Sequence, residues 1–156
     1  MTRVLAGLLI AGLGFAGAAS AESHITDDMK MAAVKARQST MQLYAFNLGQ
    51  LGNMAKGAMA YDADLAKAAA GNLVKLSTTN QMAMWLPGTD NASMEGTKAL
   101  PAIWEDMDGI MAASKAMVDA SMAMEEAAGD EAAMKAAMGD LGKSCGGCHQ
   151  NFRASN

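Results

Sequence analysis

Both cysteines of the chain, Cys145 and Cys148, lie in the short segment GKSCGGCHQNFR, and His149, one of two histidines, follows them directly. This C-x-x-C-H pattern is typical of covalent attachment of a c-type haem. Each thiol can add across one vinyl group of the porphyrin, and the two intervening residues let the thiols reach neighbouring pyrrole rings. The adjacent histidine then supplies the proximal nitrogen ligand of the iron. We therefore predict one haem c, attached through both cysteines.

Three other uses of the thiols fit the sequence less well. A zinc site needs a fourth ligand besides Cys145, Cys148 and His149. The sequence has no third cysteine, and the one other histidine is His24. A redox-active dithiol is expected in a strand–turn–helix setting, which a helical sequence does not provide. A disulfide between the two cysteines would be strained and would hold little of the chain together. A haem-free bundle with an incidental motif is the remaining alternative.

The N-terminal segment has the pattern of an export signal. Arg3 precedes an uncharged apolar run that ends in Ala19-Ser20-Ala21, a small-x-small cleavage pattern. We predict a secretory signal peptide over residues 1–21 and a cytochrome domain over residues 22–156, located in the periplasm. The export signal agrees with the haem motif, because bacteria attach haem to such motifs outside the cytoplasm. The alternative is an uncleaved membrane anchor, for which the run is short.

Composition and charge exclude some classes of partner. Without residues 1–21 the chain keeps eleven basic and sixteen acidic residues, which gives a formal charge of −5. Basic runs and basic–aromatic interleaving are missing from the sequence, so we expect no nucleic-acid partner. A second apolar span is also missing, so we expect no stable membrane insertion of the mature chain. The abundance of Ala, Met, Leu, Lys, Glu and Asp favours helix over strand.

Cap and turn residues divide the mature sequence into four predicted helices. The first covers about residues 27–56 and ends before Gly57, and the second starts after the N-cap Asp62 and reaches about residue 85. The third starts at about residue 99, with Pro101 in its first turn, and the fourth follows the N-cap Asp130 to about residue 153. Short connections make successive helices antiparallel. The expected fold class is therefore all-α, an antiparallel up-down-up-down four-helix bundle.

A C-terminal C-x-x-C-H in the last helix of an exported four-helix bundle resembles the class II c-type cytochromes, the cytochrome c' family. The segment AVKARQSTM, which contains Arg37, is similar to the first helix of that family. The segments ALPAIW and CHQNFR are similar to the start of its third helix and to its ending. The resemblance covers essentially the whole mature chain, and its one specific motif is the haem motif.

The resemblance also indicates which residue faces the iron opposite His149. In the gas-binding branch of the family an apolar, non-ligating residue, commonly leucine, lies there, and the iron is five-coordinate and high-spin. Alignment through Arg37 puts Met41 at this position, and a thioether is a competent soft ligand. We therefore expect the low-spin branch, an electron-transfer protein and not an enzyme, with His149 and Met41 as the metal ligands. The alternative is a five-coordinate cytochrome c' that binds or scavenges nitric oxide or other gases, with Met41 as a shield.

Helix geometry alone leaves other residues open as the distal ligand. Met29, Met31 and Met41 all lie in the first half of the helix that faces the fourth. Met31 and Met41 differ in height by about 15 Å, so only one can be level with the iron. Most of the sixteen methionines are expected to fill the core, because methionine adapts to irregular gaps. His24 would instead give a bis-histidine haem.

Several further residues could support the haem or its partners. Arg37 lies about one turn before Met41 and is expected to pair with a haem propionate, or else to be an ordinary solvated arginine. Lys143 and Arg153 flank the motif and could form a docking patch for redox partner proteins. Related bundles pair through their first two helices, so a homodimer is a further option. Three aromatic residues could pack near the porphyrin or fill the core: Tyr44, Trp104 and Phe152.

Overall fold

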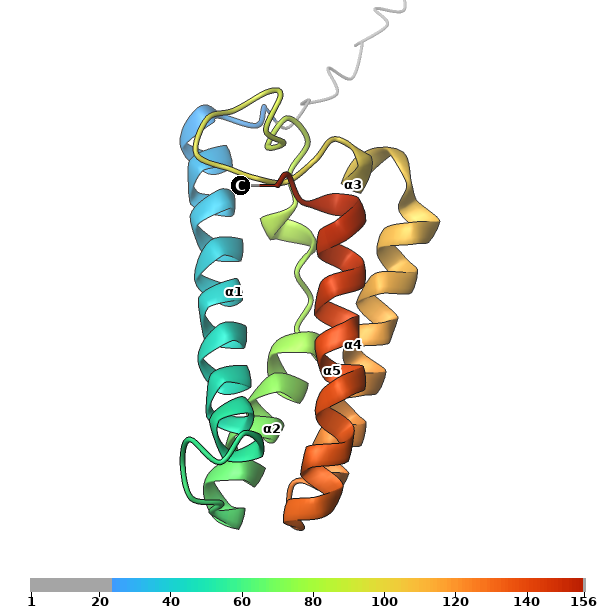
Figure 1. The fold of residues 1–156 in the computed structure, drawn as a ribbon. Coiled ribbons are helices and arrows are strands. Elements are labelled where there is room, and N and C mark those ends of the chain that lie inside the picture. The colour runs from blue at the N-terminus through green and yellow to red at the C-terminus, as the bar shows by residue number, and fades with distance from the viewer. Residues whose placement is uncertain (1–23, 156) are drawn as a thin grey trace, which may run out of the picture.

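The fold is a helical bundle whose long helices run alternately up and down (Figure 1). The computed structural model describes residues 24–155, so the predicted signal peptide over residues 1–21 lies outside the described residues. The elements are α1 (Asp27–Ala55), α2 (Ala63–Thr78), the 3-10 helix η1 (Met82–Met84), α3 (Ala102–Glu105), α4 (Met107–Ala127) and α5 (Glu131–Phe152). The long helices α1, α2, α4 and α5 confirm the predicted all-α, antiparallel four-helix bundle.

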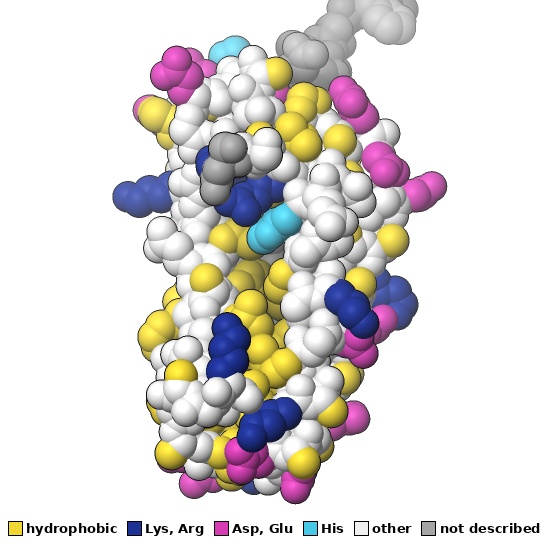
Figure 2. Space-filling model, viewed as in Figure 1, with side chains coloured by type: hydrophobic (Ala, Val, Ile, Leu, Met, Phe, Trp, Pro, Cys, Tyr) yellow, Lys and Arg dark blue, Asp and Glu magenta, His cyan; other side chains and the backbone are white. Residues whose placement is uncertain are grey.

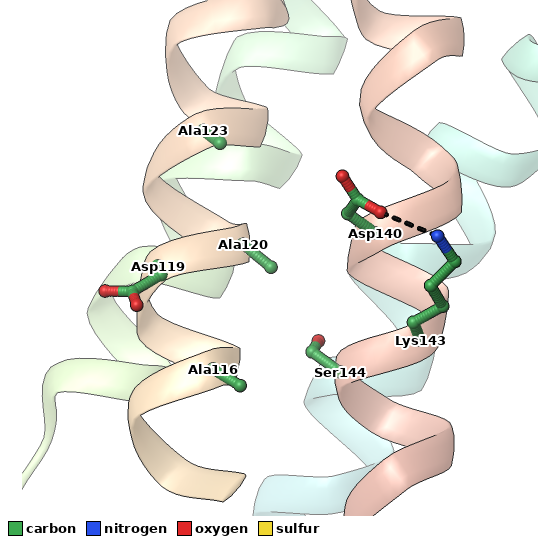
Figure 3. A pocket seen from close by; sticks show the side chains of 7 residues that line it. All are labelled: Ala116, Asp119, Ala120, Ala123, Asp140, Lys143 and Ser144. Atoms are coloured by element: carbon green, nitrogen blue, oxygen red, sulfur yellow. Dashed lines mark hydrogen bonds and ion pairs between the residues drawn. The ribbon is translucent and has the colours of Figure 1, made fainter. Parts of the chain in front are cut away.

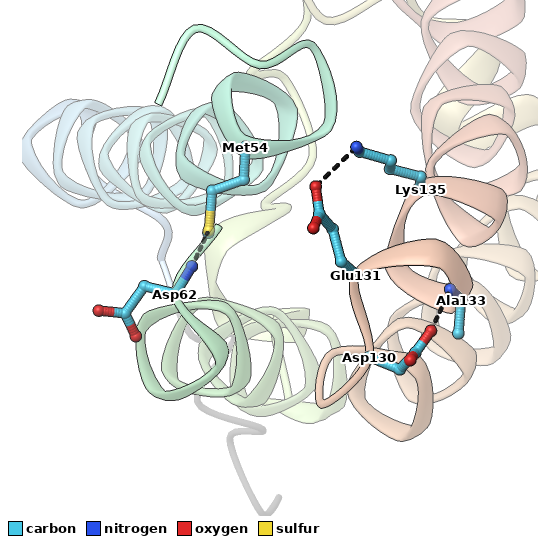
Figure 4. Close-up of polar contacts among 6 residues, drawn as sticks. All are labelled: Met54, Asp62, Asp130, Glu131, Ala133 and Lys135. Carbon is cyan, nitrogen blue, oxygen red and sulfur yellow. Dashed lines mark hydrogen bonds and ion pairs between the residues drawn. The ribbon is translucent and has the colours of Figure 1, made fainter. Parts of the chain in front are cut away.

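Side-chain caps set where the helices begin. The Asp62 carboxylate accepts hydrogen bonds from the amides of Asp64 and Leu65, at 2.9 and 3.0 Å. The Asp130 carboxylate accepts one from the amide of Ala133 at 2.8 Å (Figure 4). These bonds satisfy amides that have no partner within the helix. Both caps agree with the prediction from the sequence.

The cap of α5 has a measurable contribution to stability. Asp130→Ala removes the acceptor for the Ala133 amide, and we expect it to lower the free energy of unfolding by about 1 kcal/mol. Glu126→Ala is the matched control, because Glu126 is an exposed carboxylate near the end of α4. Urea unfolding followed by circular dichroism measures both variants. An equal loss in the two variants would contradict the capping role.

The second predicted helix is shorter than expected. It ends at Thr78 and not near residue 85, and η1 follows as a separate short turn. The hydroxyls of Ser77 and Thr79 donate to the carbonyls of Val74 and Lys75, at 3.0 and 2.7 Å. Such bonds compete with the backbone pattern of the helix, which explains why it stops in the segment Ser-Thr-Thr-Asn.

The third predicted helix is interrupted at Asp106, whose φ and ψ of −115° and 75° are not helical. The short helix α3 precedes this residue, and α4 begins directly after it. The Asp106 side chain accepts a hydrogen bond from the amide of Gly109 at 2.9 Å and so caps α4. The prediction of one continuous third helix is therefore wrong at this position.

The core fills the end of the bundle where α1 meets α2 and α4 meets α5. Its members are small or flexible apolar side chains, which allow the helices to approach closely: Leu51, Met54, Ala66, Ala69, Ala70, Leu73, Met124, Ala128, Met134 and Leu141. Helices α1 and α2, α2 and α4, and α4 and α5 pack extensively, whereas α1 and α5 meet more sparsely. The bundle is therefore closed at this end and more open between α1 and α5 toward the other. Within residues 24–155, none of the helices is long and apolar enough to cross a membrane.

Candidate functional site

The C-x-x-C-H motif lies within the last two turns of α5, which continues to Phe152. Helical spacing puts Cys145, Cys148 and His149 on neighbouring positions of one side of the helix, because residues three and four apart are neighbours on the helix surface. Both cysteines are free thiols of intermediate burial, and His149 is exposed. The motif therefore presents two thiols and an imidazole from a single rigid helix.

The register between α1 and α5 is set at the closed end of the bundle. A Cβ placed on Gly52 of α1 would lie 3.8 Å from the Cε atom of Met138 of α5, so these two faces are adjacent. Met41 lies eleven residues before Gly52, and His149 lies eleven residues after Met138. In antiparallel helices both steps lead in the same direction, and each covers about 16 Å and about three full turns.

From this register we infer that Met41 and His149 lie at about the same height on facing sides of α1 and α5. Figure 2 shows a hollow between these two helices whose floor is made of hydrophobic side chains. Met41 is 39% exposed, so its side chain is not enclosed in the core. This level agrees with Met41 as the residue that faces His149 across the haem, which stays a prediction.

The other distal candidates are far from this level. Met31 lies ten residues before Met41, about 15 Å further along α1 toward the end of the bundle. Met29 lies beyond it, and His24 precedes the Thr26 cap of α1. Met29 and Met31 are 50% and 52% exposed. Of these candidates, Met41 is therefore the one whose height along α1 is closest to that of His149.

The Cys145 thiol points toward sulfur and aromatic neighbours inside the bundle. Its Sγ lies 4.0 Å from the Sδ of Met117 in α4, and Ser144 donates a hydrogen bond to the same Sδ at 3.4 Å. Burial is the main cause that raises the pKa of Cys145, and it also raises that of Cys148. Burial likewise raises the pKa of Tyr44, with a further contribution from Cys145. Met117 could not be identified from the sequence, because its contact with Cys145 depends on how α4 packs on α5.

Raised thiol pKa values predict slow alkylation of the haem-free chain. At about pH 8 a smaller fraction of each buried thiol is ionised than in an unfolded chain, and the thiolate is the reactive form. We expect iodoacetamide to react more slowly with the folded chain than with the urea-unfolded chain, and the difference to shrink as the pH rises through the raised pKa values. Mass spectrometry of quenched samples follows both cysteines. Equal rates at about pH 8 would contradict the effect of burial.

Cys148 borders a second, outward-facing hollow between α4 and α5. This hollow has a volume of about 280 Å³, and its lining includes Gly147, Cys148 and Phe152. An adjoining hollow of about 480 Å³ continues along the same two helices and is lined by small residues and three charged ones (Figure 3). None of the C-x-x-C-H residues lines that larger hollow. The reactive residues of the motif thus lie near the C-terminal end of α5, where the smaller hollow reaches Cys148.

The protonation of His149 suits a metal ligand. Desolvation by neighbouring groups lowers the pKa of His149, and the positive charge of Arg153 lowers it further. A lower pKa favours neutral imidazole, which is the form that binds iron. Two free thiols three residues apart on one helix, a histidine that favours neutral imidazole and an apolar hollow therefore fit a covalent haem.

Arg37 is buried and not solvated. Its side chain is 3% exposed, and Nη1 donates to the Met84 carbonyl at 3.2 Å and to the Thr89 hydroxyl at 2.7 Å. Nη2 donates to the Thr89 carbonyl and, at 2.8 Å, to the Thr97 hydroxyl. Both terminal nitrogens are thus engaged, and a contact with a haem propionate stays a prediction that Nε–H could fulfil. The sequence did not indicate these partners, because they lie about fifty residues away in the chain.

The other residues that the sequence suggested as supports for the haem or its partners each have different neighbours. Trp104 donates from Nε1 to the Trp85 carbonyl at 3.1 Å, and the two rings pack edge to face. Phe152 is 5% exposed at the end of α5. Lys143 is exposed and pairs with Asp140 at 3.0 Å, which reduces the charge available for docking a partner. The backbone of Arg153 pairs with Ala99 in an isolated antiparallel bridge, and its side chain is exposed.

Comparisons with known proteins cover nearly the whole chain. The family model described as Cytochrome C' matches residues 32–153. The chain is 40% identical over 154 residues to cytochrome c' of Cereibacter sphaeroides, and the match covers 98% of both chains. The solved structure of cytochrome c' from Rhodobacter Spheriodes superposes with a TM-score of 0.79 at 40% identity, and it covers 81% of this chain and 98% of that one.

A further structural match concerns a ligand complex. It is a ferrous variant of cytochrome c prime from Alcaligenes xylosoxidans with bound NO, with a TM-score of 0.72 and 34% identity. The match covers 81% of this chain and 97% of that one.

The narrower expectation of a low-spin His/Met electron carrier finds no support in these comparisons. Motif, fold and comparisons agree that the chain belongs to the cytochrome c' family, whose members carry a covalently attached c-type haem.

Proposed function

We propose that this chain binds a diatomic gas, such as nitric oxide or carbon monoxide, at the open face of a five-coordinate haem iron. The observation that carries the proposal is the match along the whole chain to proteins named cytochrome c', together with a related structure that contains bound NO. In this account His149 is the protein ligand of the iron, and Cys145 and Cys148 hold the porphyrin. Gas binding by a five-coordinate haem is the alternative that the sequence left open beside electron transfer.

Met41 acts as a shield in this proposal. When bound, a haem held by His149, Cys145 and Cys148 would supply an iron atom able to take up a gas. The thioether side chain of Met41 is apolar and flexible, so it can keep water away from that side and move when a small ligand enters.

We also propose that the protein is a binding protein and not an enzyme. The site combines an iron ligand, two attachment points and an apolar wall, and it offers no pair of groups suited to general acid–base catalysis. Among residues 24–155, groups of three or more His, Cys, Asp or Glu side chains that could hold a further metal ion are not found. The proposed location is the periplasm, as the predicted signal peptide suggests.

A second candidate function is electron transfer with His149 and Met41 as axial ligands. The observation that favours it is the common height of the two residues on facing sides of α1 and α5, which would also suit a bond from sulfur to iron. Such a haem would have no open position for a gas. Redox partner proteins would then dock near the haem edge. A homodimer is compatible with both functions, since Leu43 and Phe46 of α1 are 51% and 64% exposed.

Gas titration of the ferrous holoprotein tests the proposal. We expect nitric oxide and carbon monoxide each to form one adduct per chain, seen as a shift of the haem absorption bands. Holoprotein heated and refolded in the same buffer serves as a control for partly unfolded haem. Failure of carbon monoxide to bind, with an unchanged spectrum at saturating gas, would overturn the proposal in favour of the electron carrier.

A further inference from the structure

Arg37 ties the helix that carries Met41 to the long connection between α2 and α4. Its guanidinium donates four hydrogen bonds to Met84, Thr89 and Thr97. It also lies over the ring of Trp85, with Cζ 4.8 Å from the ring centroid. The planar fork of arginine fixes several acceptors at once, which the point charge of lysine cannot do. Arg37 therefore holds a particular arrangement of this connection.

Two neighbours of Arg37 hold the same segment. Gln38 donates from Nε2 to the carbonyl of Gly96 at 2.7 Å. Thr40 directs its hydroxyl to the Sδ of Met84 at 3.8 Å, a weaker contact through sulfur. The segment 84–97 is thus bound to the turn of α1 that directly precedes Met41. Among these contacts, those of Arg37 are the most deeply buried.

The following residues of the same connection are bound to the end of α5. The amide of Leu100 donates to the carbonyl of Phe152 at 3.0 Å, and the amide of Ala154 donates to the carbonyl of Lys98 at 2.8 Å. Phe152 lies three residues after His149. One stretch of chain, residues 84–100, therefore links the turn of α1 beside Met41 to the turn of α5 beside His149.

We propose that Arg37 is a positioning residue that sets the separation of α1 and α5 at the level of Met41 and His149. The two helices contact each other at the closed end, near Gly52 and Met138, whereas the connection spans between them at the other. Through residues 84–100, Arg37 would set how closely the Met41 side chain can approach a bound haem. The inference rests on the haem site but holds for either of its two functions.

The test compares Arg37→Lys with Lys35→Arg, the reverse exchange at an exposed position of the same helix. In the Arg37→Lys holoprotein we expect the amide of Leu100 to exchange its hydrogen at least about tenfold faster than in the unchanged holoprotein. We expect Lys35→Arg to leave this rate unchanged. Unchanged exchange in Arg37→Lys would overturn the proposed link to α5.

A second measurement asks whether Arg37 acts through Met41. Flash photolysis of the ferrous carbon monoxide complex should show a change of about threefold or more in rebinding rate for Arg37→Lys, and no change when Met41→Ala is already present. An equal change in both backgrounds would overturn the proposal, because Arg37 would then act on the haem by another route. If Arg37→Lys does not fold, Thr97→Val takes its place with the same expected direction in the rebinding rate. This variant removes the hydroxyl that accepts from Arg37 and also from the amide of Ala99.

Carbon monoxide binding by the unchanged protein distinguishes a failure of the proposed function from a failure of the inference about Arg37. If the unchanged protein does not bind carbon monoxide, the proposed gas binding fails, and the ferric high-spin fraction replaces the rebinding rate as the readout. In that case Arg37→Lys should raise the high-spin fraction, since Met41 would lose its fixed distance to the iron. An unchanged fraction would then overturn the inference independently of the function.

Discussion

Replacing Cys145 and Cys148 together with serine is expected to abolish covalent haem attachment. Serine hydroxyls do not add across the porphyrin vinyl groups, so both thioether bonds would be lost while the fold keeps side chains of similar size. After expression with the haem maturation machinery, the denatured variant should have the mass of the bare polypeptide, and acidified organic solvent should extract any haem that remains. The unchanged protein should keep one haem per chain through the same treatment.

The single variants refine this expectation. Cys145→Ser and Cys148→Ser should each leave one thioether, so that denatured protein still carries haem but with a shifted absorption spectrum. Ser144→Ala is the matched control, because it changes a hydroxyl next to Cys145 and removes a contact to Met117 without touching a thiol. Full haem retention by the double serine variant would show that the motif is not the attachment point.

Met41→Ala is expected to have the largest effect on ligand binding. In the proposed function the Met41 side chain must move before a gas reaches the iron. If that movement costs about 1.4 kcal/mol, its removal speeds carbon monoxide association by about tenfold. Stopped-flow mixing of the ferrous protein with carbon monoxide measures the rate. The haem of the variant should stay high-spin, as in the unchanged protein.

Met31→Ala is the control for this variant, because Met31 is also an exposed methionine of α1 and lies about 15 Å from the level of His149. It should leave the association rate unchanged. A conversion from low-spin to high-spin iron in Met41→Ala would contradict the shielding role and would support Met41 as an axial ligand. An unaltered rate and spectrum would place Met41 away from the iron altogether.

Local features of the sequence predicted most of the bundle. Asp62 and Asp130 mark helix starts because an N-cap needs only its own next few residues, and Gly57 follows α1 with a φ of 73°. The haem motif was recognisable for the same reason, since its chemistry depends on five consecutive residues. The breaks at Thr78 and Asp106 were missed, although the hydroxyl-rich segment after Leu76 was a usable signal for the first.

Features that depend on tertiary packing could not be predicted. Helix geometry alone did not separate Met31 from Met41, and only the resemblance to the family selected Met41; the register of α1 against α5, indicated by Gly52 and Met138, supplies an independent argument. The burial of Arg37 depends on Thr89 and Thr97 in a connection that the sequence suggested to be simple turn structure. The resemblance to a family therefore singled out Arg37 as a site residue. The hydrogen-bond partners of Arg37 could be found only from the fold.

The spin state of the ferric haem tests the central claim most directly. Electron paramagnetic resonance and absorption spectra of the purified holoprotein report whether the iron has one protein ligand or two. We predict a high-spin, five-coordinate spectrum, with His149 as the one protein ligand and Met41 near the iron but unbound. A low-spin spectrum with the weak far-red band of sulfur-ligated iron would contradict this account and establish Met41 as the second ligand.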